Sequence, residues 1–113
     1  MKTYVYIAGP YTRGDCVQNV RRAILVADRL ATQGFVPFIP HLSHFWHFLC
    51  PHEIQFWYDL DLAWLRKCDC LLRLSGDSMG ANLEVTVARE HGIPVYWTVP
   101  ELLEGEARAE EAT

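Results

Sequence analysis

The sequence predicts an α/β fold in which helices cover both faces of a small, mostly parallel sheet, giving three layers. Short runs rich in β-branched and aromatic residues alternate along the chain with longer segments of helical periodicity. An amphipathic helix joins the first two predicted strands within about forty residues, a spacing typical of a right-handed βαβ unit. Small-residue loops at 9–14 and 76–80 each follow a predicted strand. Such loops lie at the carboxyl edge of a parallel sheet, where α/β proteins bind ligands.

The first half of the chain supplies this βαβ unit. Residues 3–8 are expected to form a buried strand, because β-branched and aromatic side chains dominate them. A helix is expected from Asp15, a suitable N-cap, to Gly34, a typical stop. Residues 35–39 form a second predicted strand, which Pro37 places at the edge of the sheet. The predicted inner face of the helix consists of Val17, Val20, Ile24, Ala27 and Ala31.

The second half of the chain adds two more strands. Residues 53–67 have helical periodicity, and residues 70–74 form an apolar run that is expected to be a buried strand. A further helix follows the second small-residue loop and ends at Gly92. Residues 93–98 supply a fourth strand, and an acidic helix follows it.

Length and charge restrict the classes of function. The 113 residues are expected to form a single domain, 1–113, with an acidic C-terminal tail at about 101–113. Five glutamates and one arginine in this tail account for the net charge of −4. Without a basic stripe, a small molecule is the expected partner, rather than nucleic acid or an anionic membrane. No apolar stretch has the length of a membrane span and the N-terminus has no leader pattern, so a cytoplasmic location is expected.

Residues 40–58 concentrate four histidines and six aromatic residues in nineteen positions. This density is typical of a lid over a flat, ring-shaped ligand, of a subunit interface or of a half-buried aromatic cover. Zinc binding is a weaker alternative, because His41, His44, His47 and Cys50 follow one another at intervals of three. No carboxylate or second cysteine completes that set, so no metal is expected.

Two carboxylates are candidates for chemistry. Glu84 is expected in the first turn of its helix, where free N–H groups and the helix dipole favour a charged carboxylate. The alternative is that Glu84 only starts the helix. Asp61 shares an apolar helical stripe with Ile54, Tyr58 and Leu65. A charge buried there is costly unless it meets a partner or a ligand, so a functional role is expected for Asp61.

Three sequence blocks resemble the nucleoside 2-deoxyribosyltransferase-like superfamily, and within it the 2'-deoxynucleoside 5'-monophosphate N-hydrolases. They are YIAG at 6–9, DLAWL at 61–65 with Asp69 eight residues after Asp61, and SMGANLE at 78–84. The resemblance covers nearly the whole chain. It implies a flavodoxin-like three-layer sandwich that needs no cofactor and that forms a homodimer or a larger homo-oligomer.

The resemblance also implies roles for individual residues. Glu84 matches the catalytic nucleophile, Asp61 the carboxylate that faces the base, and Tyr6 the tyrosine that hydrogen-bonds the nucleophile. Ser78 matches the phosphate-binding serine of the hydrolases, at a position where transferases acting on free nucleosides carry an aspartate. His41 matches a histidine of the substrate pocket.

The loop after Gly9 departs from the pattern of the hydrolases. It reads PYTRGD at 10–15, so Arg13 matches their arginine-bearing loop only loosely. With Gly9, Arg13 and Gly80 included, the expected substrate-binding residues come from both small-residue loops. A nucleoside and its 5'-monophosphate both remain open as substrates.

The expected function is enzymatic cleavage or transfer of the N-glycosidic bond of a (deoxy)nucleoside or a nucleoside 5'-monophosphate. A carboxylate such as Glu84 stabilises or captures the cation-like sugar. A carboxyl on an apolar face, such as Asp61, has a raised pKa and supplies the proton or hydrogen bond that the departing base needs. The base, the sugar and the acceptor, water or a second base, stay open. The alternative is a non-catalytic nucleotide-binding sensor that signals through the aromatic segment.

Overall fold

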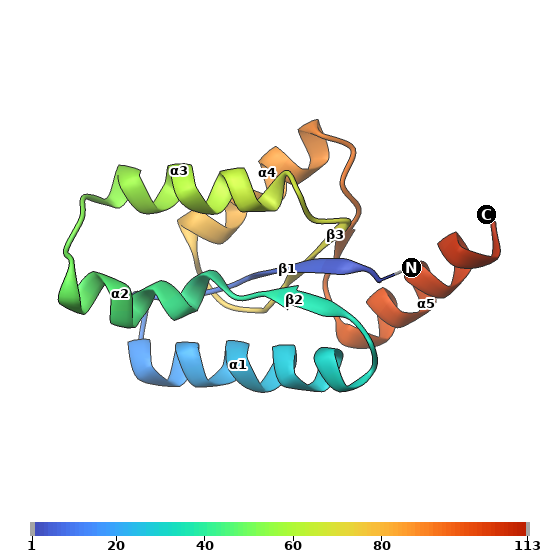
Figure 1. Ribbon diagram of the computed structural model, residues 1–113, viewed down its shortest axis with the longest axis horizontal. Coiled ribbons are helices and arrows are strands. Elements are labelled where there is room, and N and C mark those ends of the chain that lie inside the picture. Colours follow the sequence, from blue (N-terminus) through green and yellow to red (C-terminus); the bar gives the residue numbers. More distant parts are fainter. Residues whose placement is uncertain (1, 113) are drawn as a thin grey trace.

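A four-stranded sheet lies at the centre of the structure, a computed structural model that describes residues 2–112 (Figure 1). The strand order is β2-β1-β3-β4 and every pairing is parallel. This is the order of flavodoxin-like folds, so the predicted α/β class is confirmed, and the sheet is wholly parallel. The strands are β1 (Tyr4–Ala8), β2 (Val36–Phe38), β3 (Cys70–Arg73) and β4 (Val95–Tyr96).

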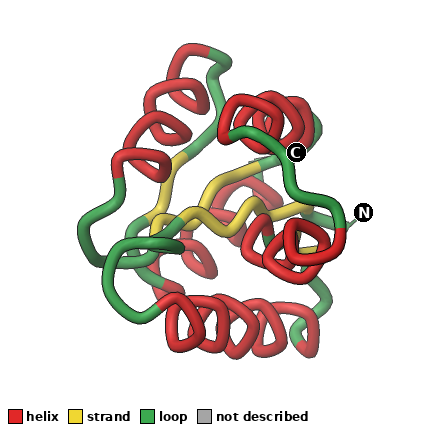
Figure 2. Tube along the Cα trace, turned by 90° about the vertical axis from the view of Figure 1, so that its left-hand side faces the viewer, coloured by secondary structure: helices red, strands yellow, loops and turns green. Residues whose placement is uncertain are grey.

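Helices cover both faces of this sheet, as the tube view of Figure 2 shows. Helices α1 and α5 pack on one face, and helices α3 and α4 pack on the other. Within the described residues, no helix is long and apolar enough to cross a membrane. The helical segments are α1 (Cys16–Thr32), the short 3-10 turn η1 (Pro40–Leu42), α2 (Ser43–Leu49), α3 (Ile54–Leu65), α4 (Met79–Glu90) and α5 (Val99–Glu111).

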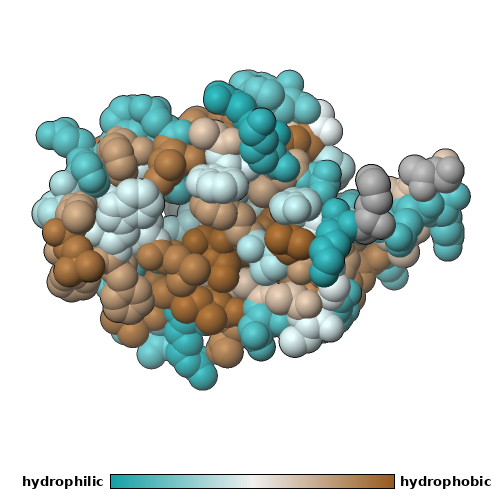
Figure 3. Space-filling model, in the orientation of Figure 1, coloured by the Kyte–Doolittle hydropathy of each residue, from teal (hydrophilic) through white to brown (hydrophobic). Residues whose placement is uncertain are grey.

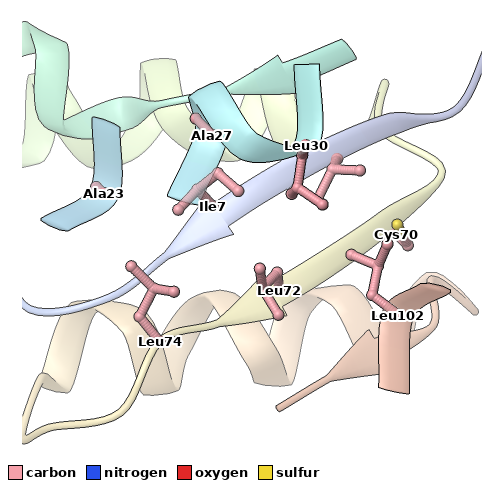
Figure 4. Close-up of a cluster of buried hydrophobic side chains, with 9 residues drawn as sticks. Ile7, Ala23, Ala27, Leu30, Cys70, Leu72, Leu74 and Leu102 are labelled. Carbon is pink, nitrogen blue, oxygen red and sulfur yellow. The ribbon is translucent and has the colours of Figure 1, made fainter. Parts of the chain in front are cut away.

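The alternation of side chains along β1 divides the core into two parts. Val5 and Ile7 point to the face that α1 and α5 cover, where they pack with residues such as Leu102 (Figure 4). Tyr6 and Ala8 point to the opposite face and pack in the cluster formed with α3 and α4. Tyr6 is therefore fully buried on the face that carries both helices with the candidate carboxylates.

Helix α1 begins after Asp15, as predicted, and the Asp15 side chain accepts a hydrogen bond from the Gln18 N–H. Its buried face is rotated by roughly 60° from the predicted face, given the helical repeat of 3.6 residues per turn. The predicted stripe included Val17 and Ile24, which are large but exposed. The observed stripe instead places two alanines close to the sheet. It consists of Val20, Ala23, Ala27 and Leu30.

Both outer strands are shorter than predicted. Strand β2 has three residues and lies at the edge of the sheet, where Pro37 predicted it. Strand β4 has only two residues. Two neighbours limit it, because Pro94 has no N–H to donate and Thr98 already serves as the N-cap of α5, accepting a hydrogen bond from the Glu101 N–H at 3.2 Å.

Candidate active site

The candidate site lies beyond the carboxyl ends of β1 and β3, the central strands of the sheet. The loops that follow these two strands touch each other. A Cβ atom added at Gly9 would lie 2.9 Å from Leu74 Cβ, so the first loop requires glycine at this position. Gly76 has a φ of +118° and packs against Pro10, whose Cγ would lie 2.8 Å from an added Cβ. Two glycines thus allow the loops to meet at the point where α/β folds bind ligands.

A cavity of about 700 Å³ opens above these loops. This volume falls within the range of small-molecule sites. Its walls come from the loop after β1, from η1, from α3 and from the start of α4. Seven of the eight predicted site residues line it: Gly9, Arg13, His41, Asp61, Ser78, Gly80 and Glu84.

Tyr6, the eighth predicted residue, lies behind Glu84. Its buried hydroxyl donates a hydrogen bond to Glu84 Oε2. Burial raises the pKa of Glu84 to about 8, and the negative charge of Asp61 raises it too, whereas the Tyr6 hydrogen bond and the positive charge of Arg73 lower it. Burial also holds the Tyr6 pKa well above its ordinary value, so the phenol stays a donor. The Tyr6 hydrogen bond therefore orients the Glu84 carboxyl. A pKa of about 8 allows this carboxyl to gain or lose a proton near neutral pH.

Glu84 lies in the second turn of α4, so its predicted place in the first turn is wrong. The helix begins at Met79 and has no acidic residue in its first turn. Ser78 is the N-cap, and its Oγ accepts a hydrogen bond from the Ala81 N–H at 3.0 Å. Because the effect of the helix dipole fades beyond the first turn, burial and neighbouring charges set the ionisation of Glu84.

Asp61 brings a second carboxyl into the same cavity from α3. Burial raises its pKa to about 7. Ile54, from the same predicted stripe, is exposed near the start of the helix, and Leu65 is buried near its end. The inner face of α3 therefore begins at the cavity with Ile54 and ends in the core with Leu65. Asp61 lies between these two residues along the helix.

His41 and Arg13 line the same cavity from η1 and from the loop after β1. His41 is only 3% exposed, and its Nε2–H donates to the Pro10 carbonyl oxygen at 3.0 Å. Burial lowers the His41 pKa, so the imidazole that lines the cavity is uncharged at physiological pH. Arg13 lies on the exposed loop, which Asn19 holds through hydrogen bonds from Nδ2 to the carbonyl oxygens of Tyr11 and Arg13, at 3.0 and 2.8 Å. Arg13 is thus a cation at the cavity mouth.

The histidines of residues 40–58 are not gathered for zinc. No group of three or more His, Cys, Asp or Glu side chains within residues 2–112 is placed to hold a metal ion. His44 Nδ1 instead lies 2.9 Å from the Tyr11 hydroxyl. His47 Nδ1 accepts a hydrogen bond from Trp57 Nε1 at 2.9 Å. His44 thus connects α2 to the loop after β1, and His47 connects α2 to α3.

The comparisons with known proteins agree with this architecture. Residues 3–98 match the family described as Domain of unknown function (DUF7768). The chain belongs to this family. No curated protein matches the sequence at a significant level. Among the matching solved structures is a 2-deoxyribosyltransferase from the psychrotolerant bacterium Bacillus psychrosaccharolyticus, with a TM-score of 0.60, 22% sequence identity, and coverage of 81% of this chain and 69% of that chain. At this identity the likeness establishes a shared fold.

In this DUF7768 chain the structure adds site residues that the sequence reasoning missed. Trp57 and Tyr58 of α3 and Asn82 of α4 also line the cavity. Arg73, at the end of β3, is buried and donates to Asn82 Oδ1 at 2.9 Å. A charged residue within an otherwise apolar strand was a usable signal for Arg73. Tyr58 lies three residues before Asp61 on the same predicted helical stripe, which was a usable signal, whereas nothing in the sequence separated Trp57 from its aromatic neighbours.

Proposed function

We propose that the protein cleaves the N-glycosidic bond of a nucleoside 5'-monophosphate, with Glu84 as nucleophile and Asp61 as the acid that serves the base. The observation that carries the proposal is the partly buried hydrogen bond from Tyr6 to Glu84 in a cavity that also holds Asp61. Two carboxyls in one pocket are the parts that retaining glycosidases use. The shared fold with a 2-deoxyribosyltransferase supports the same class of bond.

The first step transfers the sugar to Glu84. The ionised carboxylate attacks C1' of the sugar, the bond from C1' to the base nitrogen breaks, and its electron pair leaves with the base. Asp61 gives the departing base a proton, for which a pKa of about 7 is well matched near neutral pH. The reactive form therefore has Asp61 protonated and Glu84 ionised. Because the Glu84 pKa of about 8 lies above the Asp61 pKa of about 7, the free site holds more of the reverse form, and the reactive form is the minor one. The Tyr6 hydrogen bond favours the reactive form.

The second step releases the sugar from Glu84. A water molecule attacks C1', the ester bond to Glu84 breaks, and its electron pair returns to the carboxylate. Asp61, now ionised, takes the proton of the water. A free base that entered instead of water would accept the sugar and make the reaction a transfer. Hydrolysis is the proposed outcome because Ser78 matches the phosphate-binding serine of the N-hydrolases, where transferases acting on free nucleosides carry an aspartate.

Two residues at the cavity mouth are proposed to hold the 5'-phosphate. The Ser78 Oγ already accepts a hydrogen bond from the helix, but its hydroxyl proton remains available to a phosphate oxygen. The first residues of α4, 79–81, also line the cavity, and helix N-termini favour anions. Arg13 lines the same cavity and can add a charge-assisted hydrogen bond.

A panel of substrates tests the proposed function. The protein is incubated with nucleosides and their 5'-monophosphates, in deoxy and ribo forms, with and without a free base, and the products are separated by chromatography. We expect release of free base from one or more 5'-monophosphates without an added acceptor. Base exchange alone would place the protein among transferases. Tight binding without turnover would favour the nucleotide-binding sensor.

We also propose that the chain forms a homodimer through the apolar surface of α2 and the start of α3. Figure 3 shows apolar side chains gathered at the end of the molecule where Figure 1 places α2. Phe48 is 73% exposed and Leu49 is 85% exposed. Apolar patches of this kind mark interfaces, and this one adjoins the cavity through His47 and Trp57. The other large exposed apolar residues of the patch are Leu42, Phe45, Trp46, Ile54 and Phe56.

Light scattering tests the dimer. We expect a dimer at micromolar concentration for the wild type and a monomer for Leu49→Glu, because the charge would be buried in the interface. Leu25→Glu is the matched control, since Leu25 is exposed on α1, away from the patch, and should leave the mass unchanged. A wild-type monomer would remove the dimer from the proposal.

A further inference from the structure

Arg73 occupies an unusual place for an arginine. It ends the central strand β3, and its residue surface is only 5% exposed. Its guanidinium donates to the carbonyl oxygen of Leu74, to the carbonyl oxygen of Gly76 at 2.9 Å and to Asn82 Oδ1 at 2.9 Å. One side chain thus joins the end of the strand, the loop that follows it and the first turns of α4. Glu84 lies two residues after Asn82 on that helix.

The hydrogen bonds of Arg73 go to neutral oxygens, so its charge is left to act over a longer range. The acidic groups that act on it are Glu84 and Asp77, and the nearby Arg22 of α1 opposes them. Around Glu84, the charged and titratable groups are Tyr6 from β1, Asp61 from α3 and Arg73 from β3. Of these, Arg73 is the one cation, and it lowers the pKa of Glu84. Burying an arginine for packing alone would be costly.

We propose that Arg73 is the positioning residue of the site: its fork of N–H donors fixes the loop after β3 and the start of α4, and its positive charge balances the carboxylate of Glu84. This inference rests on the proposed function, because it gives Glu84 the role of nucleophile. An arginine suits both tasks, since its planar guanidinium stays charged and donates in several directions at once. A lysine keeps the charge but cannot span the same three acceptors.

The test measures the ionisation of Glu84 directly. Carbon-13 NMR follows the glutamate side-chain carboxyls through a pH titration of the full chain, and the Glu84 signal is assigned by its loss in Glu84→Gln. Three variants are compared with the wild type: Arg73→Gln, which removes the charge, Arg73→Lys, which keeps it, and Arg22→Gln as a matched control. Arg22 donates to Ser75 Oγ at 3.2 Å, so it contacts the same loop from outside.

Removing the charge should raise the titration midpoint of Glu84 by about half a pH unit or more, because the ionised form loses the positive charge that lowers its pKa. Arg73→Lys should stay within about 0.3 unit of the wild type, and Arg22→Gln should also stay there. On the best substrate of the panel, Arg73→Gln should lower kcat and move the acid limb of its pH profile upward. Arg73→Lys should lower kcat about tenfold without moving that limb, because the loop loses its support.

Two results would overturn the inference. One is an unchanged Glu84 midpoint in Arg73→Gln, which would leave Arg73 a purely structural residue. The other is a full rate in Arg73→Lys, which would show that the fork is dispensable. Circular dichroism shows whether Arg73→Gln folds. If it does not fold, Arg73→Lys tests the inference alone: its Glu84 titration midpoint must match the wild type and its kcat must be lower. The titration needs no turnover, so an inactive wild type would contradict the proposed function while leaving the midpoint comparison valid.

Discussion

The hydroxyl of Tyr6 donates a hydrogen bond to Glu84 Oε2 although the two residues are 78 positions apart in the sequence. Strand β1 supplies one partner and helix α4 the other, and both belong to the core on the same face of the sheet. The fold therefore delivers a fully buried donor to a carboxylate at the cavity floor. A donor fixed in this way keeps the Glu84 carboxylate oriented, as its proposed role as nucleophile requires.

Tyr6→Phe should lower kcat about ten- to a hundredfold, the worth of one hydrogen bond to a charged group. The ring should stay in place, because Phe38 contacts it at a centroid distance of 5.5 Å. Since the hydrogen bond lowers the Glu84 pKa, the acid limb of the rate profile should also move to higher pH. Steady-state kinetics from pH 5 to 9 check both effects. An acid limb at the wild-type pH would show that the Tyr6 hydroxyl does not affect the ionisation of Glu84.

Asp61→Asn should lower the rate about a hundredfold on bases that leave poorly and less on bases that leave readily, because it removes the proton donor. The domain should remain folded, since the amide has the same shape. Asp59→Asn is the matched control, because Asp59 lies on the same helix, is exposed and accepts a hydrogen bond from Gln55 Nε2. A uniform loss across all bases would indicate a positioning role instead.

The half-buried carboxyls Glu84 and Asp61 should make the fold less stable as the pH rises. Burial raises the Glu84 pKa from 4.5 to about 8 and the Asp61 pKa from 3.8 to about 7. Between those limits the folded protein holds protons that the unfolded chain has already released, so the free energy of unfolding falls with increasing pH. Below about pH 4 neither group affects stability through ionisation.

Glu84→Gln should therefore raise Tm by roughly 4 °C or more at pH 8, where the wild type buries a charge, with the gap closing toward pH 4. Thermal melts followed by circular dichroism at both pH values provide the measurement. Glu90→Gln, at an exposed position of the same helix, should show no such dependence. A gap of equal size at both pH values would show that Glu84 does not titrate abnormally.

Ser78→Ala combined with Arg13→Ala should abolish a preference for the 5'-monophosphate over its nucleoside while sparing activity on the nucleoside. The expected loss in kcat/KM is about a hundredfold on the monophosphate, because a charge-assisted contact and a hydroxyl donor are both removed. Wild-type kcat/KM values that are equal for the two substrates would argue against a phosphate site and place the protein on the transferase side.

The fold could be predicted from the sequence because it depends on local patterns. Apolar runs, the N-cap at Asp15 and the edge proline Pro37 each act within a few residues, and each lies where it was expected. The face of α1 was predicted less well, since the apolar periodicity selected Val17 and Ile24, which are exposed, and omitted Ala23 and Leu30, which are buried. Close packing between elements is invisible to a periodicity count.

The two carboxylates of the candidate site could be predicted from the sequence, but the contacts of Arg73 beside them could not. The spacing of the motifs marked Asp61 and Glu84, and the structure places both in one cavity. The assignment of Glu84 to the first turn placed the start of α4 too late, because the helix begins directly after its N-cap Ser78. Arg73 acts through two backbone carbonyls and Asn82. Such contacts arise only once the loop has folded.

The most direct test of the central claim compares base release by the wild type, Glu84→Gln and the control Glu90→Gln on the best substrate of the panel, with binding of that substrate measured by calorimetry. A nucleophilic role for Glu84 predicts that the glutamine variant binds the substrate but releases base at least about a thousandfold more slowly, while the control keeps the wild-type rate. A Glu84→Gln variant that retains most of the wild-type rate would contradict the proposed mechanism.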